Sequence, residues 1–202
     1  QFTKIKFNME QKRIGNYLIE VNYDDSPRNP REDDNITTMI CFHKRYDLGD
    51  KHDLKSSQFD SWNEVIDYIN ENYKVLTSKF LHLYDHSGIT ISTSSFNDRF
   101  DSGIVGIVFI DEKNCKSLMG EVITDEEKLS SIIEAEVKTY DTYIRGEVYG
   151  YRVYKIDTCN LGHEHKEEVE SCWGYYGEDE CMQEAENIVE YLMSKEQERV
   201  IQ

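Results

Sequence analysis

The chain has 202 residues, of which 38% are hydrophobic and 12% aromatic, and its 40 acidic and 23 basic residues give a formal net charge of −17. That aromatic content argues against a disordered acidic chain, and no stretch reaches the ~18–20 apolar residues of a membrane span. The negative charge argues against sequence-independent binding of nucleic acid, since phosphate binding needs a basic surface. The N-terminal residues lack the apolar run of a secretory signal, so we expect a cytoplasmic protein.

The first half of the chain predicts short strands and one clear helix. Residues 16–22 and 36–42 have strand patterns, and the loop between them holds both prolines, which disfavour regular structure. Ser61 and Glu64 match a capping box at the start of an amphipathic helix over residues 61–73. Further strands are expected over residues 80–84, 89–93 and 103–110, the last of them buried on both faces.

The second half predicts the longest helix and a hairpin. Thr124 and Glu127 match another capping box, and Gly146 stands where a C-terminal cap belongs. Gly150 indicates a bulge or the close approach of another backbone. The expected elements are a helix over residues 124–146, a hairpin of strands 147–157 and 169–175 with a long polar tip, and an amphipathic helix over residues 179–194.

These elements predict an α+β fold. Strands come in pairs, without regular alternation of strand and helix, so we expect one mainly antiparallel sheet with about three helices packed on it. Residues 16–202 are expected to form a single domain. Residues 1–15 are expected to be a loose N-terminal segment or an added edge strand.

The five cysteines are scattered, and their number is odd. In a chain without a signal sequence this pattern predicts reduced, mostly buried thiols rather than a disulfide framework. One subset has the residue types of a zinc site, with the spacing C-x3-H-x-H-x6-C. We interpret it as a polar hairpin tip and expect no metal and no cofactor. Its members are Cys159, His163, His165 and Cys172.

The charge is unevenly distributed. Residues 157–202 carry 13 acidic and 3 basic side chains, a net charge of −10, whereas the first 22 residues carry +2. Surface carboxylates keep a protein soluble, but the negative electrostatic field of a carboxylate cluster also steers docking onto a basic surface. We predict a partner-binding surface with aromatic anchors among the carboxylates. Its residues are Glu167, Glu168, Glu170, Trp173, Tyr175, Tyr176, Glu178, Asp179 and Glu180.

A second candidate site comes from polar segments over residues 43–53 and 84–103. Imidazole with carboxylate is a usual ligand set of hydrolytic metal centres, and His–Asp pairs serve as general bases. Asp-Ser-Gly and Asp-His-Ser-Gly are equally good turn sequences, so a structural role is the competing interpretation. The side chains that could converge at one end of a sheet are Asp47, His52, Asp85, His86 and Asp101.

Four segments of the chain carry a family resemblance. They are LYDHSG, FDSGIVG, TYDTYIRGEVYGY and SCWGYYG. With their surroundings, over residues 16–180, they resemble small acidic accessory proteins of phages, plasmids and conjugative elements in low-GC Gram-positive bacteria. The resemblance implies a mobile-element protein of the bacterial cytoplasm, similar in role to anti-restriction and anti-CRISPR proteins. It supplies no catalytic residues.

Together these observations predict a non-enzymatic inhibitor of a bacterial defence nuclease. It would bind the nuclease's basic nucleic-acid channel, not nucleic acid or membrane. The alternative is a metal-dependent hydrolase that acts on a nucleotide or nucleic acid through the His/Asp set. A third hypothesis is a module that sequesters a signalling nucleotide on a basic patch of Lys44, Arg45 and Lys51.

Overall fold

The computed structural model describes residues 10–98 and 100–201 of the chain. These residues contain eight strands and four α-helices, and all strand pairs are antiparallel. The chain divides into two compact units, one formed by Gln1–Arg28 with Gly146–Gln202 and the other by Asn29–Arg145. Each unit has its own sheet and its own core. The predicted α+β class is confirmed.

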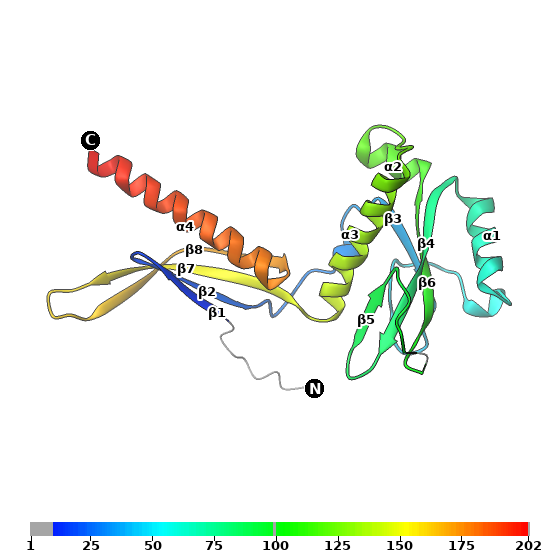
Figure 1. Cartoon of the computed structure of the whole chain (residues 1–202), viewed down its shortest axis with the longest axis horizontal. Coiled ribbons are helices and arrows are strands. Elements are labelled where there is room, and N and C mark those ends of the chain that lie inside the picture. The colour runs from blue at the N-terminus through cyan, green and yellow to red at the C-terminus, as the bar shows by residue number, and fades with distance from the viewer. Residues whose placement is uncertain (1–9, 99, 202) are drawn as a thin grey trace. The chain divides into compact units, whose positions relative to one another are not determined.

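The first unit is a four-stranded sheet covered on one face by a helix (Figure 1). The strand order is β1-β2-β7-β8, and α4 packs on β2 and β7 through residues such as Cys181, Ala185 and Val189. Among the described residues of this unit, no helix lies on the opposite face of the sheet. The elements are β1 (Glu10–Ile14), β2 (Tyr17–Tyr23), β7 (Val148–Thr158), β8 (Glu164–Tyr176) and α4 (Glu178–Ile201).

The second unit has a sheet of order β3-β6-β4-β5 with helices on both faces (Figure 1). Leu129, Ile133 and Val137 of α3 pack on one face, and Val65 and Ile69 of α1 pack on the other. Its strands are β3 (Thr37–Cys41), β4 (Val75–Asp85), β5 (Ile89–Ser92) and β6 (Ser102–Asp111). Its helices are α1 (Trp62–Asn72), α2 (Glu112–Met119), α3 (Glu126–Ile144) and the short 3-10 turns Pro30–Glu32 and Ser56–Gln58.

Helix caps account for most of the helix boundaries. The Ser61 hydroxyl accepts the N–H of Glu64 at 3.4 Å, so α1 begins where the capping box predicts. The α3 helix begins one residue later than predicted, because Asp125 rather than Thr124 caps it. The prediction omitted α2, a short and mostly polar helix that Asp111 caps at its start.

Two parts of the predicted architecture are wrong. There are two sheets instead of one, and the described residues contain four α-helices instead of about three. Pairing partners depend on long-range contacts, which the local patterns do not carry. For the N-terminal segment, the structure shows an added edge strand over residues 10–14, which is one of the two predicted alternatives. Residues 1–9 lie outside the described part. The single domain over residues 16–202 stays a prediction; the described chain contains two compact units.

None of the described helices has the length and apolar character needed to cross a membrane. The longest, α4, carries acidic residues in its first turn and along its exposed side.

Candidate functional site

The predicted partner-binding residues lie together on the first unit, along β8 and in the first turn of α4. Residues 164–170 are all exposed, and they include four glutamates in a strand that forms an edge of the sheet. The α4 helix adds three carboxylates at its N-terminus, where negative charge interacts favourably with the helix dipole. One of them, Glu178, has its pKa raised by partial burial and by the neighbouring charges of Glu10 and Asp179. The local field is therefore negative.

The glutamates of β8 fall into two classes. Glu164 pairs with Arg13 at 2.9 Å, and Glu168 approaches Arg152 at 3.8 Å. Glu167 and Glu170 have no ion pair with a described cation. Lys155, which stands opposite Glu167 in the ladder, pairs with Glu196 of α4 instead, at 2.5 Å. Glu167 and Glu170 are thus the carboxylates of β8 that offer uncompensated charge.

The three predicted aromatic anchors differ in exposure. Trp173 is exposed on the face opposite α4, where its ring covers the backbone of Gly150. Tyr175 is half-buried and stacks near Tyr151, with ring centroids 5.7 Å apart. Tyr176 donates its hydroxyl proton to the Arg28 carbonyl at 2.8 Å. Trp173 is therefore the anchor that a partner can reach, and the two tyrosines serve the packing of this unit.

The predicted bulge at Gly150 is confirmed, but the group that approaches this glycine is the Trp173 side chain and not another backbone. A Cβ at Gly150 would lie 2.1 Å from the indole ring, so only glycine fits beneath it. The ladder shifts register between Tyr149 and Gly150, which is the expected bulge. The Arg152 guanidinium lies 5.4 Å from the indole centroid and completes the contact as a cation–π pair.

The structure brings together part of the His/Asp set. In the second unit, His86 Nδ1 lies 3.0 Å from Asp101 Oδ2, and Arg45 forms an ion pair with Asp85. Arg45, Asp85 and Asp101 line a shallow cavity of about 300 Å³. The His86 side chain is 64% exposed and lies in a tight turn in which the next residue, Ser87, has φ +58°. The Asp-His-Ser-Gly segment is therefore a turn, and its pair stands at the rim of a cavity.

Two members of that set lie elsewhere. His52 Nε2 lies 3.1 Å from the Cys41 carbonyl oxygen. The His52 ring packs edge-on against the Phe42 ring, and the two ring centroids are 5.5 Å apart. Its Nδ1 is buried without a hydrogen-bond partner among the described atoms. Asp47 is exposed in the loop after β3 and is not among the residues that line the cavity. The predicted five-residue cluster is thus a three-residue one with Arg45 added.

The Cys/His set does not assemble. Cys172 pairs with Tyr151 in the ladder, while His165 pairs with Asp157 near the hairpin end. The two are seven residues apart on one strand, which places them roughly 20 Å from each other. Among the residues that the structure describes, no group of three or more His, Cys, Asp or Glu side chains is placed to share a metal ion.

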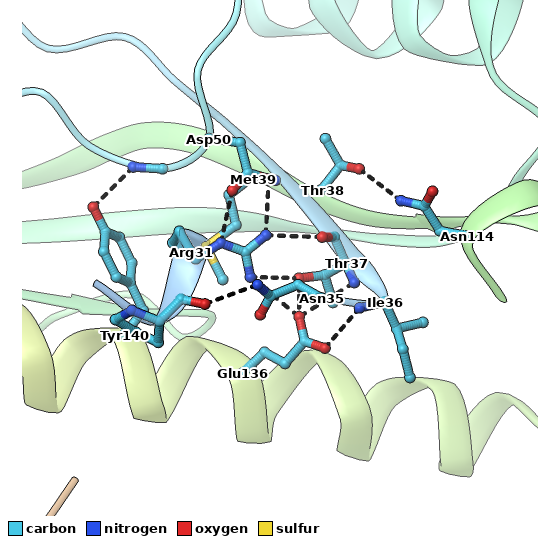
Figure 2. A network of polar contacts seen from close by, with 12 residues as sticks. Arg31, Asn35, Ile36, Thr37, Thr38, Met39, Asp50, Asn114, Glu136 and Tyr140 are labelled. Atoms are coloured by element: carbon cyan, nitrogen blue, oxygen red, sulfur yellow. Dashed lines mark hydrogen bonds and ion pairs between the residues drawn. The ribbon is translucent and has the colours of Figure 1, made fainter. Parts of the chain in front are cut away.

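The second unit contains a buried arginine cluster that no sequence pattern predicts (Figure 2). The Arg31 side chain is only 2% exposed, and it binds both oxygens of Asp50 at 2.8 Å and Glu136 at 3.1 Å. It also donates to the hydroxyl and the carbonyl of Thr37. Five hydrogen bonds match the five N–H groups of a guanidinium, so this cluster is structural. The three charged residues are far apart in sequence, and no local motif joins them.

Comparison with known proteins adds no relative. No protein-family model, no curated protein and no solved structure matches this chain.

Proposed function

We propose that the chain is a protein-binding inhibitor of a bacterial defence nuclease of the restriction or CRISPR type. It binds the basic surface through which the nuclease holds nucleic acid. The binding residues are on β8 and at the start of α4, with carboxylates that steer association and Trp173 as the exposed anchor.

The observation that carries this proposal is the uncompensated charge of Glu167 and Glu170. Both side chains are exposed on an edge strand, and neither pairs with a described cation, although nearby Glu164 and Glu168 do. Exposed ion pairs contribute little to stability, so the fold loses little by leaving Glu167 and Glu170 unpaired. A basic partner can take up the unpaired charges without breaking an existing ion pair.

The test is a titration of DNA cleavage by a purified restriction endonuclease and by a guide-loaded CRISPR effector. We expect stoichiometric inhibition that weakens as salt rises, because exposed charges are screened. The Glu167→Lys/Glu170→Lys variant should inhibit more than tenfold less well, since clustered rim charges set the association rate.

The matched control is Asp67→Lys/Glu71→Lys, which makes the same change in net charge on exposed positions of α1 in the other unit. It should inhibit as well as the unmodified chain. Equal inhibition by both double variants, or inhibition that is indifferent to salt, would contradict the proposal. Failure to inhibit either class of nuclease would also contradict it.

One observation favours a second function. The 3.0 Å pair of His86 and Asp101 at the rim of a cavity fits general-base chemistry in a hydrolase. That function predicts turnover at substoichiometric protein, and it predicts that Asp85→Ala/His86→Ala/Asp101→Ala is inactive. The inhibitor function predicts that this triple variant inhibits normally.

A further inference from the structure

We propose that the outer edge of β8 binds its partner by strand addition: an extended segment with basic residues at alternate positions hydrogen-bonds to the edge and extends the four-stranded sheet. The inference rests on the proposed function and specifies how the acidic surface engages a protein. Its basis is the backbone of β8, not the number of carboxylates.

The ladder shows which backbone groups face outward. The N–H of Ile156 donates to the Asn16 oxygen on the β2 side, at 2.7 Å, so the backbone of the preceding residue, Lys155, faces β8. Lys155 stands opposite Glu167, whose backbone groups therefore face β7. Since the direction alternates along a strand, the N–H and C=O of Lys166 point away from the sheet.

The outward-facing backbone groups form a regular series at the N-terminal end of β8. By the same alternation, the backbones of Glu164 and Glu168 also point outward, as far as the register shift between Val153 and Tyr154. Beyond that shift, the outward N–H of Ser171 is already taken by the Glu170 carboxylate at 3.1 Å. Residues 164–168 therefore present an uninterrupted edge with three outward N–H groups. No described strand or helix pairs with this edge.

The side chains beside this edge specify the charge of the added strand. Glu170 stands opposite Val153, whose side chain packs in the core beneath α4, so Glu170 lies on the α4 face. Glu167 stands opposite Lys155, two positions along, and shares that face. An added strand places alternate side chains on this face, where Lys or Arg would meet two unpaired carboxylates. Opposite charges on neighbouring strands stabilise pairing, and like charges oppose it.

The same rule disfavours a second copy of this chain as the occupant. Two β8 edges would bring glutamates against glutamates, because residues 164–170 hold four glutamates and one lysine. Charged edges are a general protection against self-association. The charges on this edge therefore disfavour pairing with a second copy of the chain and favour pairing with a basic segment.

The test compares Lys166→Pro with Lys166→Ala. Both variants lose the contacts of Lys166 with Glu20 and Tyr154. Only proline removes the outward N–H, and the β7 ladder does not use that group, so an edge strand tolerates the change. The probe is a seven-residue peptide of alternating Lys and Val, with binding measured by fluorescence anisotropy at low salt. We expect at least a tenfold loss of affinity in Lys166→Pro relative to Lys166→Ala.

A peptide with Gly in place of each Val keeps the charge but has a weak strand preference, and it should bind less tightly to the unmodified chain. Should the Lys166→Pro chain lose its thermal transition, Glu164→Pro against Glu164→Ala repeats the comparison at the first residue of β8. Equal peptide affinity in the proline and alanine variants overturns strand addition. So does a dimer of the unmodified chain in sedimentation that Lys166→Pro dissociates and Lys166→Ala does not, since a second copy would then occupy the edge.

The two proposals can fail separately. If Lys166→Pro inhibits a nuclease normally while Glu167→Lys/Glu170→Lys does not, the acidic surface binds through side chains alone. In that case the proposed function stands and strand addition is wrong. If neither variant changes inhibition, the proposed function itself is wrong.

Discussion

The two sheets of this chain differ in whether carboxylates accept the outward N–H groups of their edge strands. In the second unit, the edge of β3 is closed by carboxylates (Figure 2). Glu136 accepts the N–H groups of Ile36 and Thr37 at 2.9 and 3.2 Å, and Asp50 accepts the N–H of Met39 at 2.8 Å. In the first unit, residues 164–168 of β8 have no such acceptors among the described residues.

The other edge of the second unit is closed by the same helix. Asp141 of α3 accepts the N–H of Ile91 at 2.8 Å and the hydroxyl of Thr90 at 2.6 Å, both on β5. One helix thus supplies a carboxylate to each edge of its sheet, through Glu136 and Asp141. Carboxylates in the second unit accept backbone N–H groups at both sheet edges. In the first unit, Glu167 is exposed, and the exposed Glu170 accepts only the N–H of Ser171, beyond the open edge. Net charge alone does not separate these two uses.

The largest effect is expected from breaking the closed edge. Glu136→Ala leaves Arg31 buried with one partner fewer and uncaps two N–H groups of β3. Removing one member of a buried ion pair typically costs about 3 kcal/mol. Urea unfolding of the second unit, followed through Trp62 in a Trp173→Phe background, should show a loss of this size.

Lys138→Ala is the control, because Lys138 is exposed on the same helix and caps no strand. It should leave the urea midpoint unchanged. A midpoint for Glu136→Ala equal to that of this control would show that the cluster does not hold the β3 edge.

A smaller effect is expected at the bulge of the first unit. Gly150→Ala places a methyl group where the Trp173 ring lies, 2.1 Å from its nearest atom. Forcing the ring away should cost about 2 kcal/mol, as overpacking does, and it should change the Trp173 fluorescence in a Trp62→Phe background. In the double variant Gly150→Ala/Trp173→Ala the methyl group has space, so the two losses should not add. Additive losses would mean that the ring does not occupy this position.

Features of this fold that depend on neighbouring residues could be predicted from the sequence, whereas contacts between residues far apart in the sequence could not. Ser61 begins α1 and Gly150 marks a bulge, because a cap and a close approach each leave a local residue signature. The Arg31 cluster joins residues 19 and 105 positions apart, and no spacing rule connects them. The position of His52 was not predictable for the same reason, since its contact with Cys41 depends on how the loop folds back.

A moderate effect on stability is expected from alkaline pH. Burial raises the pKa of the Cys41 thiol from 9.0 to about 12 and that of the Tyr140 hydroxyl from 10.0 to about 12. The folded chain therefore holds these protons more tightly than the unfolded chain, and stability is lost as pH rises above the unfolded values. Cys41 alone should cost the second unit roughly 1 kcal/mol by pH 10. In Cys41→Ala the slope of stability against pH between 8 and 10 should flatten; an unchanged slope would contradict this.

The smallest effect on stability is expected from modifying an exposed thiol of β8, beyond its open edge. Cys172 is exposed on β8, whereas Cys41, Cys115 and Cys181 are buried, and burial also raises the pKa of Cys181 to about 12. Because the thiolate is the reactive form, a maleimide at pH 7 should label Cys172 first and leave the buried three unmodified in the folded chain. The adduct should leave the thermal midpoint within a degree or two, since an exposed edge carries little packing. Prior binding of the alternating Lys and Val peptide should leave this labelling rate unchanged, because the open edge ends at residue 168 and Cys172 lies beyond the register shift. Mass spectrometry of the intact protein gives both rates, and equal labelling of all five thiols would show that the first unit does not pack as described.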